Sequence, residues 1–354
     1  MQIRYSDIEA YAEQHGITTY SVHCMVVAEG FLRRAAQVEA PFVLKGSYVT
    51  RQYLKEGWRR IPADLDWIGL GKVDAAVLNR WAIAVTTCNV DDGIQFRDFS
   101  ENAFWRQIDY AMDEDFPTVN TDIDARIDDK TCELYGLDVS YNVKLIKEPS
   151  AIDYVPLFGE PFTLPLCCGI DQQIAWKLHQ CLVRPRFKDL FDLTLLLREI
   201  QVDAAAVMKA LADECTANGT LLIGKFNVLH DGTLDRHEHW QPNRYRKATP
   251  NELFSSWRHD DVIKSDMGSI EETMRQIYIG TPDIANALPE FLQEFAHLLR
   301  SAGLAPAADI ELPSDIIRQS GKANMPPAHG PIEEKSPAAQ APRRGWFSKF
   351  LGRK

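Results

Sequence analysis

The sequence predicts an α/β fold of the α+β kind, in which helices pack on a mixed sheet and a mainly helical region follows. Three observations predict it. Over residues 1–159, short apolar runs bounded by turn residues alternate with amphipathic helical stretches. From residue 160 to 302, apolar residues recur mainly at helical spacing. Residues 303–342 are rich in Ala, Pro and Ser with few large apolar side chains, which predicts a disordered linker.

The elements of the first part can be assigned in chain order from the spacing of apolar residues and the turn residues between them. We expect two helices within 1–38, a strand at 42–44, a helix at 48–56, a strand around 64–66, a helix at 73–87, a strand at 93–97 and a hairpin whose second strand spans 134–141. Helices and strands that alternate in this way favour a layered fold, with helices on a sheet.

Composition narrows the class of protein. The 354 residues are 45% hydrophobic and 25% charged, enough for one large domain or two modest ones. Neither a signal peptide nor a run of 18 apolar residues is present, so we expect a cytoplasmic protein. Seven cysteines without a C-x-x-C pair indicate neither a zinc site nor a disulfide framework. A net charge of -11 argues against broad wrapping of nucleic acid, although a local basic patch can bind an RNA end.

The most informative motif follows the first strand. Gly46 and Ser47 form a turn, and two carboxylates, Asp64 and Asp66, come next on a strand. Residues i and i+2 of a strand point to the same face, so we expect both carboxylates at one edge. Such a pair suits a magnesium ion that keeps positions for phosphate oxygens, and the turn suits the phosphates. Taken alone, Asp-x-Asp is more often a solvated strand edge.

A third carboxylate, Asp138, lies in a later run of strand-favouring residues. Apolar residues flank it on both sides, which predicts a buried carboxylate with a partner. The other acidic residues of this stretch alternate with apolar residues or lie in a turn, and we expect them to be structural parts of a solvated hairpin: Asp122, Asp124, Asp128 and Asp129.

Residues 170–197 predict two helices, one on each side of a break at Pro185. Five charged side chains follow one another along them: Lys177, Arg184, Lys188, Asp189 and Asp192. By themselves these charges are typical of a surface helix pair with ordinary i, i+3 and i+4 neighbours.

Taken in order, these motifs resemble the nucleotidyltransferase superfamily, in which Gly-Ser, a helix and an Asp-x-Asp strand follow one another. More narrowly, Lys-Gly-Ser at 45–47, Arg60 and the Asp64, Asp66 pair are similar to the AbiEii/AbiGii toxin branch, found in bacterial toxin–antitoxin and phage-defence systems. The basic-Asp-x-x-Asp helix after a helical Lys fits the same branch.

The chain departs from this family pattern at three positions. Ser47 stands where a second Gly is common, Pro62 where Ser or Thr is usual, and Lys188 where Arg is usual. Lys188 keeps the positive charge but loses the bidentate geometry of a guanidinium.

The resemblance implies a set of site residues. Magnesium ions would be held by Asp64, Asp66 and Asp138. The triphosphate would be bound by Gly46, Ser47 and Lys177. Asp189 would orient or deprotonate a catalytic partner, and Asp192 would brace the helix pair. It also implies transfer of NMP from an NTP to an acceptor, expected to be RNA or a tRNA end, by a toxin with a winged-helix antitoxin. Two alternatives stay open: a transferase that modifies a protein or small molecule, and a nucleotide-binding protein without turnover.

With this resemblance the chain divides into four parts. We expect a nucleotidyltransferase core with N-terminal helices at 1–159, a helical domain that completes the active site at 160–302, a disordered linker at 303–342 and a basic amphipathic tip at 343–354. The tip carries five cations and no acid around its aromatic residues. It could dock on anionic lipid, on a partner groove or on nucleic acid, or remain solvated.

Overall fold

The chain begins with two helices, α1 (Tyr5–His15) and α2 (Thr19–Ala35), that lead into the first strand, β1 (Phe42–Lys45), as the sequence predicts. Thr18 caps α2, because its hydroxyl oxygen accepts the N–H of Ser21 at 3.1 Å. The computed structural model describes residues 1–54, 59–62, 64–108, 117–183, 187–217, 226, 229–232, 278–280, 285 and 288–304.

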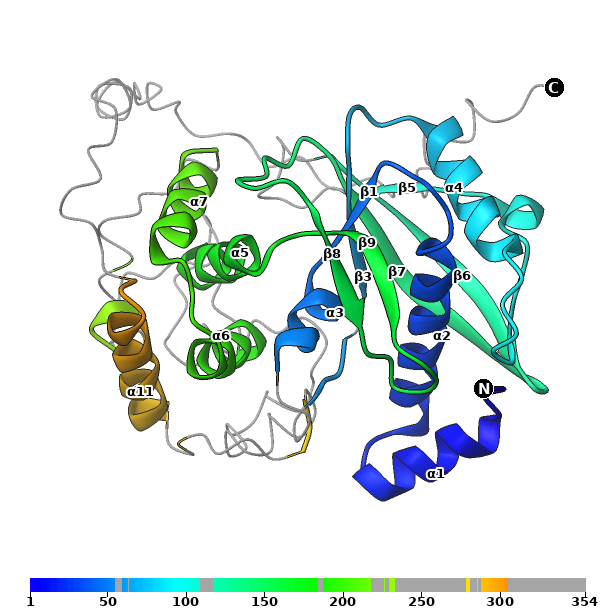
Figure 1. Ribbon diagram of the computed structural model, residues 1–354, viewed down its shortest axis with the longest axis horizontal. Coiled ribbons are helices and arrows are strands. Elements are labelled where there is room, and N and C mark those ends of the chain that lie inside the picture. Colours follow the sequence, from blue (N-terminus) through cyan, green and yellow to red (C-terminus); the bar gives the residue numbers. More distant parts are fainter. Residues whose placement is uncertain are drawn as a thin grey trace, which may run out of the picture. The chain divides into compact units, whose positions relative to one another are not determined.

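β1 belongs to an eight-stranded mixed sheet (Figure 1). Its other strands are β3 (Leu65–Gly69), β4 (Ile94–Phe96), β5 (Arg106–Ile108), β6 (Thr118–Ile127), β7 (Lys130–Ser140), β8 (Ser150–Tyr154) and β9 (Phe162–Cys167). The order is β4-β6-β7-β3-β1-β9-β8, with β5 paired to β6. β3 runs antiparallel to β1 and parallel to β7. A separate two-stranded ladder joins β2 (Arg59–Arg60) to β10 (Tyr278–Ile279).

The two faces of this sheet bury different side chains. On β1, Phe42 and Leu44 belong to the main core, whereas Val43 packs in a smaller cluster with Ile68 of β3. Successive side chains of a strand alternate between faces. Lys45 therefore shares a face with Val43, and Asp66 shares that face with Ile68, so the polar residues of β1 and β3 lie opposite the main core.

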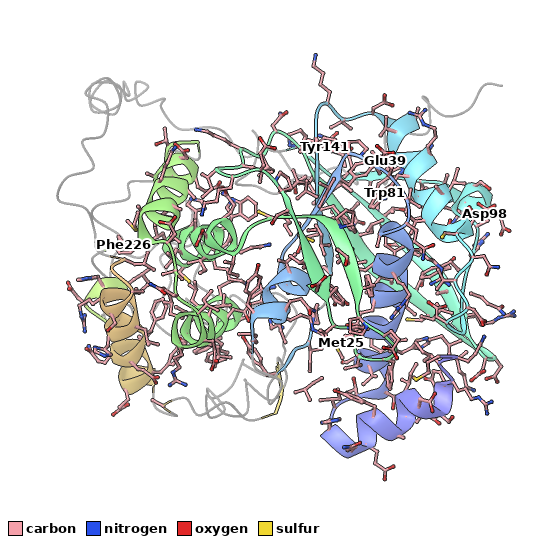
Figure 2. All side chains as sticks on the ribbon, viewed as in Figure 1. Met25, Glu39, Trp81, Asp98, Tyr141 and Phe226 are labelled. Carbon is pink, nitrogen blue, oxygen red and sulfur yellow. The ribbon has the colours of Figure 1, made fainter. Side chains whose placement is uncertain are left out.

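Helices α2 and α4 (Ala75–Thr87) pack together on the side of the main core (Figure 1). Trp81 of α4 packs against Phe42, with ring centroids 4.3 Å apart, and Met25 of α2 is fully buried (Figure 2). Asp74 caps α4, since its carboxylate accepts the N–H of Ala76 at 2.8 Å. The predicted helix at 73–87 is confirmed and starts two residues later.

The helices of the second half of the chain form a group that reaches the other face of the sheet through α5 (Figure 1). These are α5 (Ile170–Val183), α6 (Phe187–Glu199), α7 (Ala204–Ala217) and α11 (Leu288–Ser301). Trp176 of α5 packs on the cluster of Val43 and Ile68, and Phe191 of α6 meets Phe291 of α11 at 5.3 Å between ring centroids. The two helices predicted within 170–197 are confirmed, while Pro185 lies outside the described residues.

A buried ion pair fixes the segment that follows β1. Nη1 of Arg51 lies 2.6 Å from Oε1 of Glu29 on α2, and both residues are at most 4% exposed. The hydroxyl of Tyr154 donates to Oε1 at 3.1 Å and the N–H of Leu157 donates to Oε2 at 2.6 Å. Both carboxylate oxygens are thus satisfied, so the pair ties this segment to α2 and to the chain after β8.

The helix predicted at 48–56 is the clearest local error. The α-helical part, α3, spans only Ser47–Thr50, a 3-10 turn covers Arg51–Tyr53, and Leu54 is already extended. A tertiary contact overrides helix propensity here, because Arg51 pairs with Glu29 of α2. Locally, the hydroxyl of Thr50 donates to the Gly46 carbonyl at 3.1 Å.

Two boundaries differ from their expected places. β9 begins after residue 159, the expected end of the core, so the sheet takes in residues up to Cys167. Leu304 is fully buried and follows Gly303, whose φ of +72 closes α11, so two residues of the predicted linker belong to the helix end. The rest of the linker and the tip at 343–354 lie outside the described residues. The division into domains stays a prediction, because every described residue belongs to one unit, Met1–Pro306.

All seven cysteines are free thiols, and five of them are buried. Within the described ranges, no helix combines the length and the apolar character that crossing a membrane requires.

Candidate active site

A row of four polar side chains crosses the sheet on the face opposite the main core. Lys45 of β1 is the cross-strand partner of Asp66 on β3, Asp66 is the partner of Asp138 on β7, and Asp138 is the partner of Asn120 on β6. Cross-strand partners share a face and lie side by side. The structure therefore brings Asp66 and Asp138 together with a cation on one side and an amide on the other.

Asp138 is buried, as its apolar neighbours predict, with 9% of its surface exposed. Its Oδ1 accepts a hydrogen bond from Nδ2 of Asn120. This bond holds one oxygen of the carboxylate on the β6 side of Asp138, while Asp66 is its cross-strand partner on the β3 side. Sequence reasoning missed Asn120, because only the pairing of β6 with β7 reveals its place.

Asp64 comes directly before β3, two residues ahead of Asp66. Its Cβ lies close to Gly136 of β7, where an added Cβ would approach it to 3.4 Å. Burial and then the charge of Asp66 raise the pKa of Asp64, while Lys188 and Arg60 act to lower it. Asp64 thus lies beside the row, two residues before Asp66 along the chain, and within the electrostatic reach of Lys188 on α6.

Lys45 supplies positive charge to this group. Its Nζ lies 3.4 Å from Oδ1 of Asp66. Burial acts to lower the pKa of Lys45, but the charges of Asp66, Asp64 and Asp138 outweigh it and raise that pKa. Lys45 is part of the sequence motif, but the motif alone assigns it no role in the site. Its position next to Gly46 at the end of a strand is the signal that could have found it.

The turn after β1 fits tightly against Asp66. Gly46 has φ +77, and a Cβ there would lie 2.3 Å from Oδ2 of Asp66, so only glycine fits. The N–H of Gly46 donates to Oε1 of Gln173 on α5 at 3.0 Å, and its carbonyl accepts the N–H of Thr50 at 3.1 Å. Because α3 is a single turn, we assign it no helix-dipole site. The turn itself and its neighbours must supply any contact to phosphate.

A second cluster surrounds Asp192, which is fully buried on α6. Its Oδ2 lies 2.6 Å from Nζ of Lys177 on α5, its Oδ1 lies 3.2 Å from Nε of Arg60, and it accepts a hydrogen bond from the hydroxyl of Tyr278. Burial acts to raise the pKa of Asp192, but Lys177 and then Arg60 outweigh it and lower that pKa. Asp192 thus ties α6 to α5, β2 and β10.

Lys177 links this cluster to Asp189, whose Oδ1 lies 3.5 Å from its Nζ. Asp189 is 2% exposed and Lys188 is partly buried beside it on α6. Tyr278 was missed from sequence because it lies 86 residues beyond Asp192 in a stretch without a motif. Arg184, the remaining charge of this motif, lies outside the described residues.

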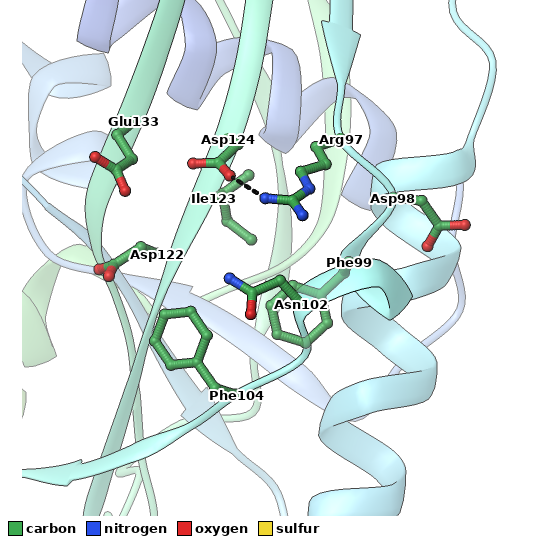
Figure 3. A pocket seen from close by; sticks show the side chains of 9 residues that line it. All are labelled: Arg97, Asp98, Phe99, Asn102, Phe104, Asp122, Ile123, Asp124 and Glu133. Carbon is green, nitrogen blue, oxygen red and sulfur yellow. Dashed lines mark hydrogen bonds and ion pairs between the residues drawn. The ribbon is translucent and has the colours of Figure 1, made fainter.

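The acidic side chains of the β6–β7 hairpin lie outside the row described above and have other partners. A small cavity of about 30 Å³ is lined by Asp98, Asp122, Asp124 and Glu133 together with Arg97 and neighbouring residues (Figure 3). Asp122 pairs with Arg106, and Asp124 lies 3.2 Å from Nη1 of Arg97. Asp128 Oδ2 accepts the N–H of Tyr5 at 2.7 Å. These contacts agree with the structural role expected for the hairpin carboxylates.

The carboxylates of the row, Asp66 and Asp138, suit a hard divalent cation, although they do not surround a metal ion on all sides. In the described part of the chain, no group of three or more His, Cys, Asp and Glu side chains is arranged so as to hold a metal ion. Magnesium is usually bound by one or two carboxylates plus substrate phosphates. Asp66 and Asp138, adjacent on parallel strands and next to the Lys45 ammonium, fit that second kind of site.

The amino-acid sequence matches a family model, and the fold is similar to that of a solved structure. The model of the family described as nucleotidyl transferase AbiEii toxin, type IV TA system, matches residues 31–264. Among solved structures, MenT4, a nucleotidyltransferase toxin from Mycobacterium tuberculosis H37Rv, is similar in fold, with a TM-score of 0.53 and 14% sequence identity over 89% of this chain and 92% of that one. No curated protein matches the sequence.

Proposed function

The chain belongs to the AbiEii family of nucleotidyltransferase toxins of type IV toxin–antitoxin systems, and from this premise we propose its cofactor, its acceptor and the roles of its residues. We propose that it is a magnesium-dependent enzyme that transfers NMP from an NTP to a hydroxyl of RNA, a tRNA end above all, and releases pyrophosphate. The observation that carries the proposal is the cross-strand pair Asp66 and Asp138, with Asp64 beside it.

In this proposal Asp66 and Asp138, with Asp64 beside them, would hold the magnesium together with phosphate oxygens of the substrate. When bound, the ion neutralises charge that develops on the transferred phosphoryl group and the leaving pyrophosphate. The protein keeps the carboxylates in place until then. Lys45 offsets the charge of Asp66 at 3.4 Å, and Asn120 fixes the orientation of the Asp138 carboxylate.

Gly46, Ser47 and Lys177 bind the triphosphate. Gly46 lets the backbone approach closely because it has no side chain, and Ser47 follows it in the same turn. An ammonium has three N–H donors, and the contacts of Lys177 with Asp189 and Asp192 leave it able to direct one of them to a phosphate oxygen.

Asp189 acts on the acceptor. As a carboxylate next to Lys177 it can accept the proton of the attacking hydroxyl or orient that hydroxyl toward the α-phosphorus. Asp192 instead braces the site, because Lys177, Arg60 and Tyr278 already occupy its oxygens.

The acceptor and the partners are proposed from the family. We propose a cytoplasmic toxin in phage defence, opposed by a winged-helix antitoxin. An RNA end requires only a local basic surface, which is compatible with the net charge of -11. A protein or small-molecule acceptor and a chain without turnover are the competing outcomes of the test below.

The proposal is tested by incubating the purified protein with magnesium, total RNA and each of the four NTPs labelled at the α-phosphate. We expect label from at least one NTP in RNA, lost when magnesium is chelated. Label in the protein itself would replace the RNA acceptor by a protein one. Absence of label from every fraction would contradict an active transferase.

A further inference from the structure

Gln173 lies at the junction of α5 and the Gly46 turn and has no role in the reaction described above. It is 2% exposed. Its Oε1 accepts the N–H of Gly46 at 3.0 Å. Its Nε2 is also buried, and among the described residues it has no hydrogen-bond partner. Leaving a buried N–H donor without an acceptor destabilises the fold, so this donor needs an explanation.

The position of this donor points to the triphosphate. Oε1 and Nε2 are bonded to the same carbon, so Nε2 lies beside the Gly46 turn, which itself touches the Asp66 carboxylate. Gln173 also precedes Lys177 by four residues on α5, and residues at i and i+4 of a helix share a face. The unpartnered donor therefore adjoins the turn and shares a helix face with the lysine that we assign to the triphosphate.

We propose that Gln173 binds the triphosphate of the substrate, an inference that rests on the proposed function. Its Oε1 holds the Gly46 N–H while the nucleotide is absent, and its NH2 group donates to a phosphate oxygen when the nucleotide binds. A phosphate oxygen is an anionic acceptor, which is the partner that a buried N–H donor gains most from. Gln173 would thus hold the Gly46 turn in its conformation through Oε1 and contact the bound phosphates through Nε2.

Gln172 provides a matched control. It precedes Gln173 in the first turn of α5, is 4% exposed, and its Oε1 accepts a backbone N–H at 3.0 Å, that of Ile146. Both glutamines therefore lose one partly buried hydrogen bond when replaced by leucine. Only Gln173 adjoins the Gly46 turn.

The experiment measures equilibrium binding of the α,β-methylene analogues of the four NTPs, which cannot be transferred, by titration calorimetry with magnesium present. We expect Gln173→Leu to weaken binding about tenfold or more, as the loss of a hydrogen bond to a charged group does. Gln173→Glu should weaken it further, because it keeps the acceptor for Gly46 but removes the donor and adds negative charge. Gln172→Leu should bind within about twofold of wild type while unfolding at a similar temperature to Gln173→Leu.

Equal binding by wild type and Gln173→Leu, or an equal loss in both leucine variants, would overturn the inference. The proposed function would survive that result if wild type still transfers label to RNA. Wild type that binds no analogue and transfers no label would overturn both. A measurement without variants uses wild type labelled with ¹⁵N-glutamine: on adding analogue, the side-chain NH2 signal of Gln173 should shift and that of Gln172 should stay, and an unmoved Gln173 signal contradicts the inference.

Discussion

Asp66 on β3 and Asp138 on β7 are direct cross-strand partners, although α4 and the strands β4, β5 and β6 lie between them in the chain. Side chains at paired positions are close enough for like charges to repel. The fold offsets this repulsion with Lys45 beside Asp66 and Asn120 beside Asp138. The site therefore depends on the order of the strands in the sheet. Substitution of the residues that contact it should change transfer or stability in predictable directions.

Gly46→Ala should reduce transfer strongly while the protein still folds. A Cβ at this position would lie 2.3 Å from Oδ2 of Asp66, so the carboxylate has to move. The positive φ of Gly46 adds strain of about 1–2 kcal/mol. Gly71→Ala is the control, because Gly71 also has positive φ but an added Cβ would meet nothing within 4 Å. Labelled transfer and urea unfolding are measured for both variants. Equal losses of transfer would contradict the claim that the close contact between Gly46 and Asp66 matters for transfer.

Lys177→Ala should weaken NTP binding and also destabilise the fold. The change leaves the buried Asp192 with Arg60 and Tyr278 only, at a cost of up to about 3 kcal/mol. Binding is therefore titrated at a temperature where the variant is folded. Lys144→Ala removes a partly exposed ion pair with Asp213 and should leave NTP binding unchanged and cost much less stability than Lys177→Ala. Unchanged NTP affinity in folded Lys177→Ala would remove Lys177 from the triphosphate site.

Lys188→Arg is expected to keep transfer, because a guanidinium retains the positive charge that faces Asp64. Steady-state transfer rates of the variant and wild type test this. A severe loss would mean that the compact ammonium is required at this position.

Tyr278→Phe should cost about 2 kcal/mol of folding free energy, since it removes the hydroxyl that donates to the Asp192 carboxylate and keeps the ring. Tyr154→Phe removes a comparable hydroxyl that donates to Glu29 at 3.1 Å, away from the Asp192 cluster. Urea unfolding should show similar losses for both variants. Transfer should fall only in Tyr278→Phe, and an equal fall in both would show that general destabilisation is the cause.

The Asp192 cluster should make stability depend on acid pH. Lys177 and Arg60 lower the pKa of Asp192 in the folded chain, so the unfolded chain takes up this proton first as the pH falls. The contribution of the carboxylate is complete above about pH 4, the usual carboxyl range, and is lost below it. The difference in unfolding free energy between wild type and Asp192→Asn should therefore be constant from pH 7 to 5 and shrink below pH 4. A difference that grows in acid would contradict this assignment.

Much of the fold follows from local sequence. Apolar periodicity predicts α1, α2, α4, α5 and α6, and the turn residues predict the hairpin of β6 and β7. The helix at 48–56 could not be corrected from sequence, because the residue that ends it, Arg51, is held by Glu29 from another helix. The late strand β9 was assigned to the helical region since a single strand of six residues carries little signal on its own.

The residues of the site, like the elements of the fold, could be predicted from sequence only in part. The motif residues Gly46, Asp66 and Lys177 could be named from sequence because their order along the chain resembles a family. Their partners could not, because Asn120, Gln173 and Tyr278 reach the site only through strand pairing and helix packing. No short pattern marks a residue whose function depends on such a contact.

The central claim is that Asp66 and Asp138 act together in transfer, and it is tested most directly by the rate of labelled transfer to RNA in Asp66→Asn, Asp138→Asn and the double variant. Asp129→Asn, at an exposed carboxylate of the hairpin turn, is the control.

Each single variant should lose about 100-fold or more of the rate with the fold retained, and the double variant should lose little more, because the two carboxylates act as one unit. The control should match wild type. A single variant that turns over at nearly the normal rate, or losses that simply multiply in the double variant, would contradict the account.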